Sequence, residues 1–156
     1  MLLSNHYEAI EKNLAYGLTI RPSSIHGEGC FATVHFFLGS QIANYVGEQI
    51  SRQEARRRRF QDAGHKICDL DTNWSIDGKC GGNGTDFINH SCIPNCEMII
   101  KERQILVFAL RDINPGEEIT IAYLEETAVL SLPCLCPLPQ CQLRRLRKEM
   151  FMHWQF

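Results

Sequence analysis

The chain has 156 residues; 44% of them are hydrophobic, 22% are charged, and the formal net charge at pH 7 is -2. This length and composition are typical of one globular domain with a single core, and the slightly negative charge argues against a general nucleic-acid binder. The first residues, MLLSNH, lack the basic start and apolar run of a signal peptide, and no stretch reaches the ~18 to 20 apolar residues of a membrane span. We therefore expect an intracellular soluble protein with no membrane partner and no direct nucleic-acid binding.

The first part of the chain predicts short elements separated by Gly and Pro. Apolar residues at helical spacing predict a short amphipathic helix over residues 1–16. Alternation of apolar and polar residues then predicts three strands, at 18–22, 30–34 and 41–46. Ser51-Arg52-Gln53-Glu54 has the spacing of a capping box, so a helix is expected from about 52 to 62.

Two basic clusters depart from the mildly acidic mean of the chain. One is Arg56 to Arg59 in the expected helix, and the other lies at residues 144–148. We expect a solvated helix face in each case. Phosphate contact or a nuclear localisation signal is the alternative.

The second part of the chain predicts more short strands. They are expected at 67–70, 74–77, 97–100, 104–110 and 119–123. A last helix is expected at 143–154, and the chain has no internal repeat. Many short strands with frequent turns predict a mainly β protein with a few short helices, built from small antiparallel sheets.

One run, DFINHSCIPNC from Asp86 to Cys96, has neither a helical nor a strand period. Core packing therefore does not explain it. Its part Asn89-His90-Ser91-Cys92-x-Pro94-Asn95 resembles the signature of SET-domain protein-lysine methyltransferases. Three further segments resemble blocks of that family in the same order. They are SIHGEGCFA at 24–32 (a cofactor loop), GEEITIAY at 116–123 (the catalytic block) and CLCPLPQC at 134–141 (the post-SET zinc segment).

This resemblance implies a domain division and a fold. Residues 1–17 would be an N-terminal helical extension, 18–126 the SET domain, and 127–156 the post-SET zinc segment with a C-terminal helix. The SET fold consists of small curved antiparallel sheets with a threaded, pseudoknot-like C-terminal segment. The threading would bring Asn89 and His90 beside Tyr123.

The resemblance also implies an activity: methyl transfer from S-adenosylmethionine to the side-chain amine of a lysine in a protein, a histone or another basic protein. Free lysine has a pKa of about 10.4, so the enzyme must desolvate and deprotonate the amine and then orient it. The protein would act in the cytoplasm, or at the nucleus and chromosome if its substrate is a histone. The alternative is a zinc-stabilised SET-like interaction module without catalysis.

By resemblance, Tyr123 is the catalytic tyrosine and Tyr45 lines the lysine channel, where an aromatic wall suits a cation or a desolvated amine. The cofactor-binding residues are expected to be His26, Gly27, Glu28, Gly29, Asn89 and His90. Alternatives remain for each group. The tyrosines could be ordinary core aromatics, the Asn-His pair could satisfy local backbone groups, and the glycines could form a simple hairpin turn.

The chain has eight cysteines. Without a signal peptide, reduced thiols and metal binding are more plausible than disulfides. Cys134, Cys136 and Cys141 supply three thiolates, whereas a closed structural zinc site takes four ligands. The family's fourth ligand maps onto Cys92, so we expect one zinc ion; taken alone, Cys92 would be a buried apolar thiol.

Two positions depart from the family pattern. The residue before Phe87 is usually arginine in SET domains, and here it is Asp86. The segment 65–71 lacks the aromatic residue that often covers the cofactor there.

Overall fold

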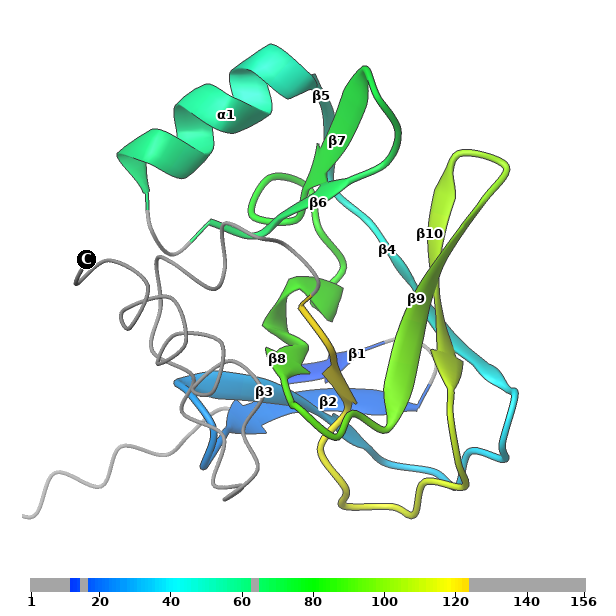
Figure 1. Ribbon diagram of the computed structural model, residues 1–156. Coiled ribbons are helices and arrows are strands. Elements are labelled where there is room, and N and C mark those ends of the chain that lie inside the picture. Colours follow the sequence, from blue (N-terminus) through cyan, green and yellow to red (C-terminus); the bar gives the residue numbers. More distant parts are fainter. Residues whose placement is uncertain (1–11, 15–16, 63–64, 124–156) are drawn as a thin grey trace, which may run out of the picture.

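The computed structural model of the chain describes residues 12–14, 17–62 and 65–123 (Figure 1). Over these residues the protein consists of small sheets, one α-helix and one 3-10 helix. The first sheet contains β1 (Lys12–Leu14), β2 (Leu18–Pro22) and β3 (Glu28–Ala32), in that order. The second contains β4 (Gln41–Tyr45), β10 (Gln104–Ala109) and β9 (Cys96–Lys101).

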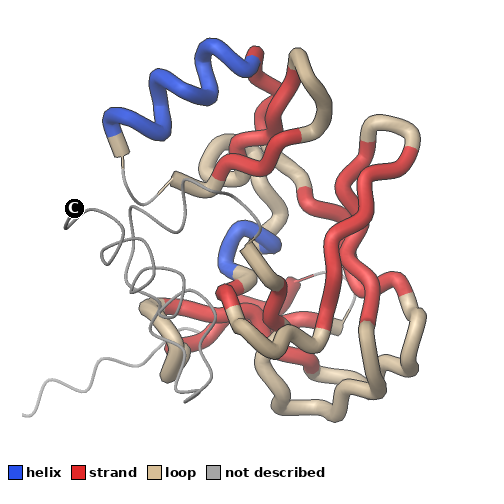
Figure 2. Tube along the Cα trace, viewed as in Figure 1, coloured by secondary structure: helices blue, strands red, loops and turns tan. Residues whose placement is uncertain are grey.

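The third sheet contains β5 (Glu48–Ser51), β7 (Trp74–Asp77) and β6 (Ile67–Asp69). The helices are α1 (Arg52–Gln61) and η1 (Thr85–Phe87). A last pair, β8 (Asn89–His90) and β11 (Thr120–Ile121), is parallel, whereas all other strand pairs are antiparallel. The expected architecture is confirmed: short strands dominate the described residues (Figure 2).

The β9–β10 hairpin forms as its sequence predicts. Gln104 pairs with Lys101, and the two residues between them, Glu102 and Arg103, have φ values of 50° and 61°. Two successive left-handed residues give the turn a twist that matches the twist of the strands. The hairpin therefore closes without glycine.

Helix α1 begins where the capping spacing predicts. The Ser51 hydroxyl accepts a hydrogen bond from the Glu54 N–H at 3.1 Å. The reciprocal half of the capping box is absent, because the Glu54 carboxylate pairs with Arg57 and Arg58 instead. Ala55 is the one buried residue of the helix, so polar contacts dominate its attachment to the β5–β7–β6 sheet beside it (Figure 1).

Part of the arginine run of α1 forms an ion-pair network with the neighbouring sheet. Arg52 and Arg59 both pair with Asp69 of β6, and Arg58 pairs with Asp77 of β7. The expectation of a solvated face is therefore wrong for Arg58 and Arg59, whereas Arg56 and Arg57 are exposed as expected. Acidic neighbours within the fold already neutralise most of the positive charge, which also weakens the case for phosphate binding.

The main core lies between the first two sheets and the β8–β11 pair. Its buried members are Leu18, Cys30, Ala32, Phe36, Ile42, Ala43, Ile88, Cys96, Val107, Ala109, Ile113, Ile119 and Ile121. Two smaller apolar clusters lie around Tyr45 and around Ile50. In Figure 1, η1 and β8 lie between the first sheet and the α1-bearing sheet.

Three local predictions differ from the structure. Lys12–Leu14 forms β1, paired with β2, so the prediction of a helix over residues 1–16 is wrong there. The backbone hydrogen bonds that β2 offers outweigh a weak local helix preference. Strand β5 and the two-residue β8 were not predicted. Residues 1–11 and the expected helix at 143–154 lie outside the described residues.

No helix in the described part of the chain is long and apolar enough to cross a membrane.

Candidate functional site

The β8–β11 pair joins the two most informative segments of the sequence. Thr120 pairs with Asn89 and Ile121 with His90. Beyond β11, the Tyr123 N–H donates a hydrogen bond to His90 Nδ1 at 3.0 Å, and the two rings lie 5.3 Å apart. The expectation that Asn89 and His90 lie beside Tyr123 is confirmed.

Tyr123 is 36% exposed, yet its hydroxyl is held inside the junction. The hydroxyl donates to the Ile88 carbonyl at 2.8 Å. Burial of this end, followed by the proximity of Cys68, raises the pKa of the phenol well above its usual value. Tyr123 is therefore a neutral phenol at physiological pH. It can offer its oxygen lone pairs to a ligand, but it cannot act as a phenolate base.

Tyr45 ends β4 and is 5% exposed. Its hydroxyl donates to the Lys66 carbonyl at 2.7 Å. Burial is the largest cause of its raised pKa; a hydrogen bond with the Cys68 thiol and the proximity of Asp86 and Tyr123 raise it further. The structure therefore brings the two tyrosines to the same site, with Cys68 near both. No local pattern in the sequence singles out Cys68 as a site residue.

Tyr45 also packs as the core alternative expected, against Leu70 and Ile105. One side chain thus serves both purposes: its ring fills the second apolar cluster while its hydroxyl end reaches the site.

Asn89 ties the expected cofactor loop to the junction. It is 4% exposed, and its amide nitrogen donates to the carbonyls of His26 and Glu28 at 3.2 and 3.1 Å and to Glu118 Oε1 at 2.8 Å. Asn89 thus satisfies backbone groups of a remote segment, whereas the alternative expected local ones. His26 and Glu28 join the network through their backbone, and their side chains are exposed.

Glu118 is a site residue that the sequence analysis missed. Its carboxylate accepts hydrogen bonds from the Ser23 hydroxyl at 2.8 and 2.9 Å in addition to the bond from Asn89. A Cβ on Gly29 would lie 2.3 Å from Glu118 Oε1, so only glycine permits this contact. The one available signal was the place of Glu118 in the GEEIT block.

Gly27 has a different constraint. Its φ is +48°, a left-handed value that favours glycine, and a Cβ there would meet no atom within 4 Å. The turn therefore presents open backbone at Gly27 and close packing at Gly29.

His90 lies between Tyr123, the candidate catalytic residue, and Cys92, the candidate metal ligand. Burial lowers the pKa of its imidazole, so the ring is neutral at physiological pH. Nδ1 accepts from the Tyr123 N–H, which leaves the proton on Nε2; this atom lies 3.2 Å from Cys92 Sγ. Cys92 is half-buried. Cys134, Cys136 and Cys141, the other expected metal ligands, lie outside the described residues.

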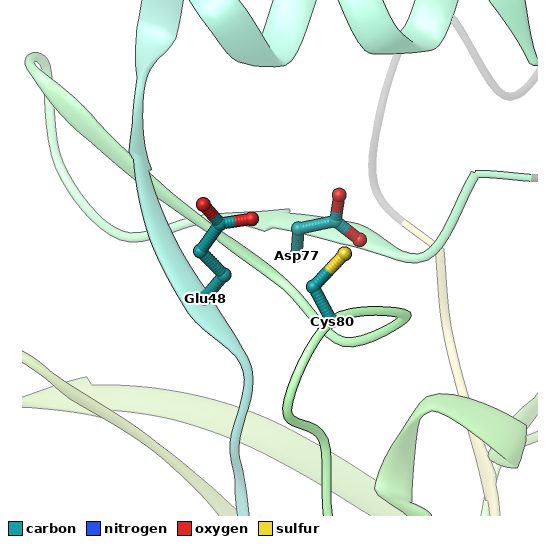
Figure 3. Close-up of side chains that lie close together, drawn as sticks. All are labelled: Glu48, Asp77 and Cys80. Carbon is teal, nitrogen blue, oxygen red and sulfur yellow. The ribbon is translucent and has the colours of Figure 1, made fainter.

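A second group of potential metal ligands lies elsewhere. The ligand atoms of Glu48, Asp77 and Cys80 are all within 4.8 Å of one another (Figure 3). Arg58 Nη1 lies 2.7 Å from Glu48 Oε2, 2.6 Å from Asp77 Oδ2 and 3.8 Å from Cys80 Sγ. The guanidinium already supplies the cation that a metal would bring, so this cluster is an anchor for α1.

The chain matches the model of the SET domain over residues 27–124. It is 34% identical over 146 residues to a protein of Oryza sativa subsp. japonica named histone-lysine N-methyltransferase TRX1. It is 35% identical over 151 residues to a Schizosaccharomyces pombe protein named histone-lysine N-methyltransferase, H3 lysine-4 specific, and 39% identical over 132 residues to a protein of the same name in Emericella nidulans.

These alignments cover 87%, 91% and 77% of the present chain but 14%, 16% and 11% of the three relatives. The chain thus corresponds to a small part of each of these much longer proteins. Its match to the domain model spans well over half of its own length and includes the Asn89–His90 strand, Tyr45 and Tyr123. The chain therefore belongs to the SET-domain family.

Proposed function

We propose that this protein transfers methyl groups from S-adenosylmethionine to the side-chain amine of lysine in a protein substrate, a histone first of all. The observation that carries the proposal is the junction in which Tyr123 bonds to His90 Nδ1 and to the Ile88 carbonyl. That contact sets the catalytic candidate beside the cofactor-loop network of Asn89. The names of the relatives point to the same reaction and to histone substrates.

The two phenols suit the orientation of an amine. Each hydroxyl donates a hydrogen bond to a backbone carbonyl. Tyr45 donates to the carbonyl of Lys66, and Tyr123 donates to the carbonyl of Ile88. The oxygen lone pairs that remain can accept N–H bonds from a neutral lysine. Such bonds would direct the nitrogen lone pair away from both oxygens and toward the methyl donor.

The turn at 23–29 fits a cofactor that needs backbone contact. Gly27 leaves open space, and the Glu118–Ser23–Asn89 network holds the turn in place. S-adenosylmethionine, when bound, supplies the electrophilic methyl of its sulfonium. We assign His26, Gly27, Glu28, Gly29, Asn89 and His90 to this cofactor.

We further propose a zinc ion bound by Cys92, Cys134, Cys136 and Cys141. The spacing of the three C-terminal cysteines supports it. Cys92 adds support because its half-buried sulfur lies beside His90. Zinc there would hold the segment after 126 near the site, in keeping with a division into an extension (1–17), a SET domain (18–126) and a post-SET segment (127–156). A histone substrate would place the protein at the nucleus and chromosome.

Methyl transfer is tested with tritiated S-adenosylmethionine and mixed core histones, followed by mass spectrometry of the labelled protein. We expect label on a lysine with the wild-type protein and about 100-fold less with Tyr123→Phe. Binding of S-adenosylhomocysteine is measured in parallel. A protein that binds this ligand yet labels neither histones nor a cell lysate would favour the non-catalytic interaction module.

A further inference from the structure

Strand β9 is the longest edge strand among the described sheets. It has six residues, and β10 is its one neighbour in the sheet order β4–β10–β9 (Figure 1). Within the described part of the chain, the backbone of residues 97–101 makes no hydrogen bond other than those with β10. Alternate N–H and C=O groups on the outer side of β9 therefore have no protein partner there.

The next longest edge strands are covered by other parts of the fold. At β3, the Cys30 carbonyl accepts a hydrogen bond from the Ile119 N–H at 2.7 Å. At β4, the Asn44 carbonyl accepts one from the Asn83 amide at 3.0 Å. Strand β9 is thus the long edge that the described fold leaves open.

The sequence of β9 lacks most of the features that usually protect an open edge. The strand contains neither Pro nor Gly, its pairing with β10 has no bulge, and Ile99 and Ile100 are 40% and 53% exposed. Its two charged residues, Glu97 and Lys101, are both exposed. Neither forms a hydrogen bond or ion pair through its side chain in the described residues. An apolar edge of this kind is suited to pairing with another strand.

The spacing of the two charges selects one self-complementary register. When two identical strands pair antiparallel, the residue on the two-fold axis faces its own copy, and positions equally far on either side of it face each other. Glu97 and Lys101 lie equally far from Ile99. A pair centred on Ile99 therefore places Glu97 opposite Lys101 of the partner subunit, and the symmetry repeats this contact. Residues 97, 99 and 101 lie on the same face of the strand, so the two ion pairs would flank the contact between the isoleucines.

Neighbouring registers lose this match. In a pair centred on Met98, Glu97 would face Ile99 of the partner subunit; in a pair centred on Ile100, Lys101 would face it. A register centred between two residues would set an outward-pointing backbone group against an inward-pointing one, so regular antiparallel pairing excludes it. In the register centred on Ile99, Met98 faces Ile100 of the partner subunit, which adds an apolar contact on the other face.

We propose that β9 is a dimerisation edge, through which two copies of this chain pair about Ile99 and join their β4–β10–β9 sheets into one. The occupant is a second copy because the charge pattern of the strand is complementary to itself. The pairing uses none of the candidate site residues, so it is independent of the proposed function. A single short edge pair is a small interface, which is typical of weak and reversible association.

Sedimentation velocity of the whole 156-residue chain over a series of concentrations tests the proposal. We expect a reversible monomer–dimer equilibrium. Glu97→Lys and Lys101→Glu each set like charges opposite each other at two symmetric positions, so each should raise the dimer Kd by about 10-fold or more. The double variant Glu97→Lys/Lys101→Glu restores opposite charges in reversed order, and it should return the Kd to the wild-type value.

A matched control separates the pairing from net charge. Arg56→Glu changes the net charge as Lys101→Glu does, but Arg56 is an exposed residue of α1, outside the sheet. It should leave the dimer Kd unchanged. A thermal melt of each variant verifies folding.

A crosslink tests the register directly. With Ile99→Cys, a short bismaleimide reagent should link position 99 of one subunit to position 99 of the other, as identified by mass spectrometry of peptides. Gln104→Cys on β10, away from the edge, should give no link between the two copies of position 104.

A protein that stays monomeric at every concentration would overturn the proposal. So would a dimer whose Kd none of the β9 variants changes, because its contact would then lie on another surface. A double variant that dimerises no better than the single variants would overturn the register centred on Ile99.

Discussion

Single hydroxyl groups determine how the two tyrosines of the site can act. Both phenols donate to backbone carbonyls, and burial raises the pKa of each further above neutral pH. Their role is therefore to accept hydrogen bonds and to shape the site. Glu118 is a comparable case, since one carboxylate links Ser23 with Asn89.

Tyr123→Phe should remove one acceptor at the reacting centre and little else. We expect the rate of methyl transfer to fall about 100-fold or more, with about 1 kcal/mol of stability lost with the bond to Ile88. Single-turnover rates and thermal melts measure the two effects. Near-normal turnover with intact cofactor binding would remove Tyr123 from the catalytic role.

Gly29→Ala should disturb the packing of the candidate cofactor turn at residues 23–29 against Glu118. The new Cβ would lie 2.3 Å from Glu118 Oε1, so the carboxylate must leave its contacts with Ser23 and Asn89. Overpacking of this kind costs about 1–3 kcal/mol, and we expect weaker binding of S-adenosylhomocysteine as well. Gly39→Ala, at a positive-φ turn with open space, tests backbone strain without the clash. Equal effects of both changes on ligand binding would contradict the network.

At the level of elements, α1 is held by charge rather than by an apolar face. Ala55 is its one buried residue, and its basic side chains reach β5, β6 and β7 through carboxylates. Arg58 makes the densest of these contacts, bonding to Glu48, Glu54 and Asp77.

Arg58→Ala should therefore destabilise the protein more than any other substitution in the basic run. It would leave Asp77, which is 4% exposed, without its cation. We expect a clear drop in the urea midpoint. Arg56→Ala is the matched control, because Arg56 has no ion pair among the described residues; like most surface changes it should stay within about 0.5 kcal/mol. Equal midpoints for the two variants would refute the anchoring role of Arg58.

The same network predicts an acid-sensitive α1. Hydrogen bonds from Arg57 and Arg58 lower the pKa of Glu54 from 4.5 to about 2. A carboxylate with a depressed folded-state pKa contributes stability that is present above pH 4.5 and is lost as pH falls toward 2. The stability difference between wild type and Glu54→Gln should therefore be constant from pH 7 to 5 and shrink below 4.5. Denaturation curves across this range measure it, and a constant difference down to pH 2.5 would be inconsistent with the lowered pKa.

Across the whole molecule, the site depends on contacts between distant parts of the chain. Ser23 meets Glu118 across 95 positions, and Tyr123 meets Ile88 across 35. Asn95, 4% exposed, holds the chain on both sides of Ile119: its amide donates to the Glu118 carbonyl, and its oxygen accepts from the Thr120 N–H. Bringing such distant segments together costs chain entropy. A metal ion that crosslinks the chain would offset part of this cost.

We predict about one zinc per chain by metal analysis. Cys136→Ser should release the metal, lower Tm and abolish methyl transfer, because a structural zinc contributes directly to folding free energy. Cys80→Ser, whose thiol faces Arg58, is the control and should retain zinc. Metal-free protein with full activity would disprove the zinc site.

Much of the local structure could be predicted because it depends on neighbouring residues. The β9–β10 hairpin, the Ser51 cap and the strands around the Asp71 turn follow from alternation and side-chain capping within a few positions. The blocks around His90 and Tyr123 were likewise visible as local strings, and they identified the family.

Only the tertiary structure decided which of these local pieces meet. Strands β8 and β11 have two residues each, too few for any period, and they exist because each completes the other's hydrogen bonds. The contacts of Glu118 with Ser23 and Asn89 and the proximity of Cys68 to both tyrosines have the same origin. Side-chain contacts between remote segments depend on the packing of the whole fold, and local sequence periodicity does not encode them.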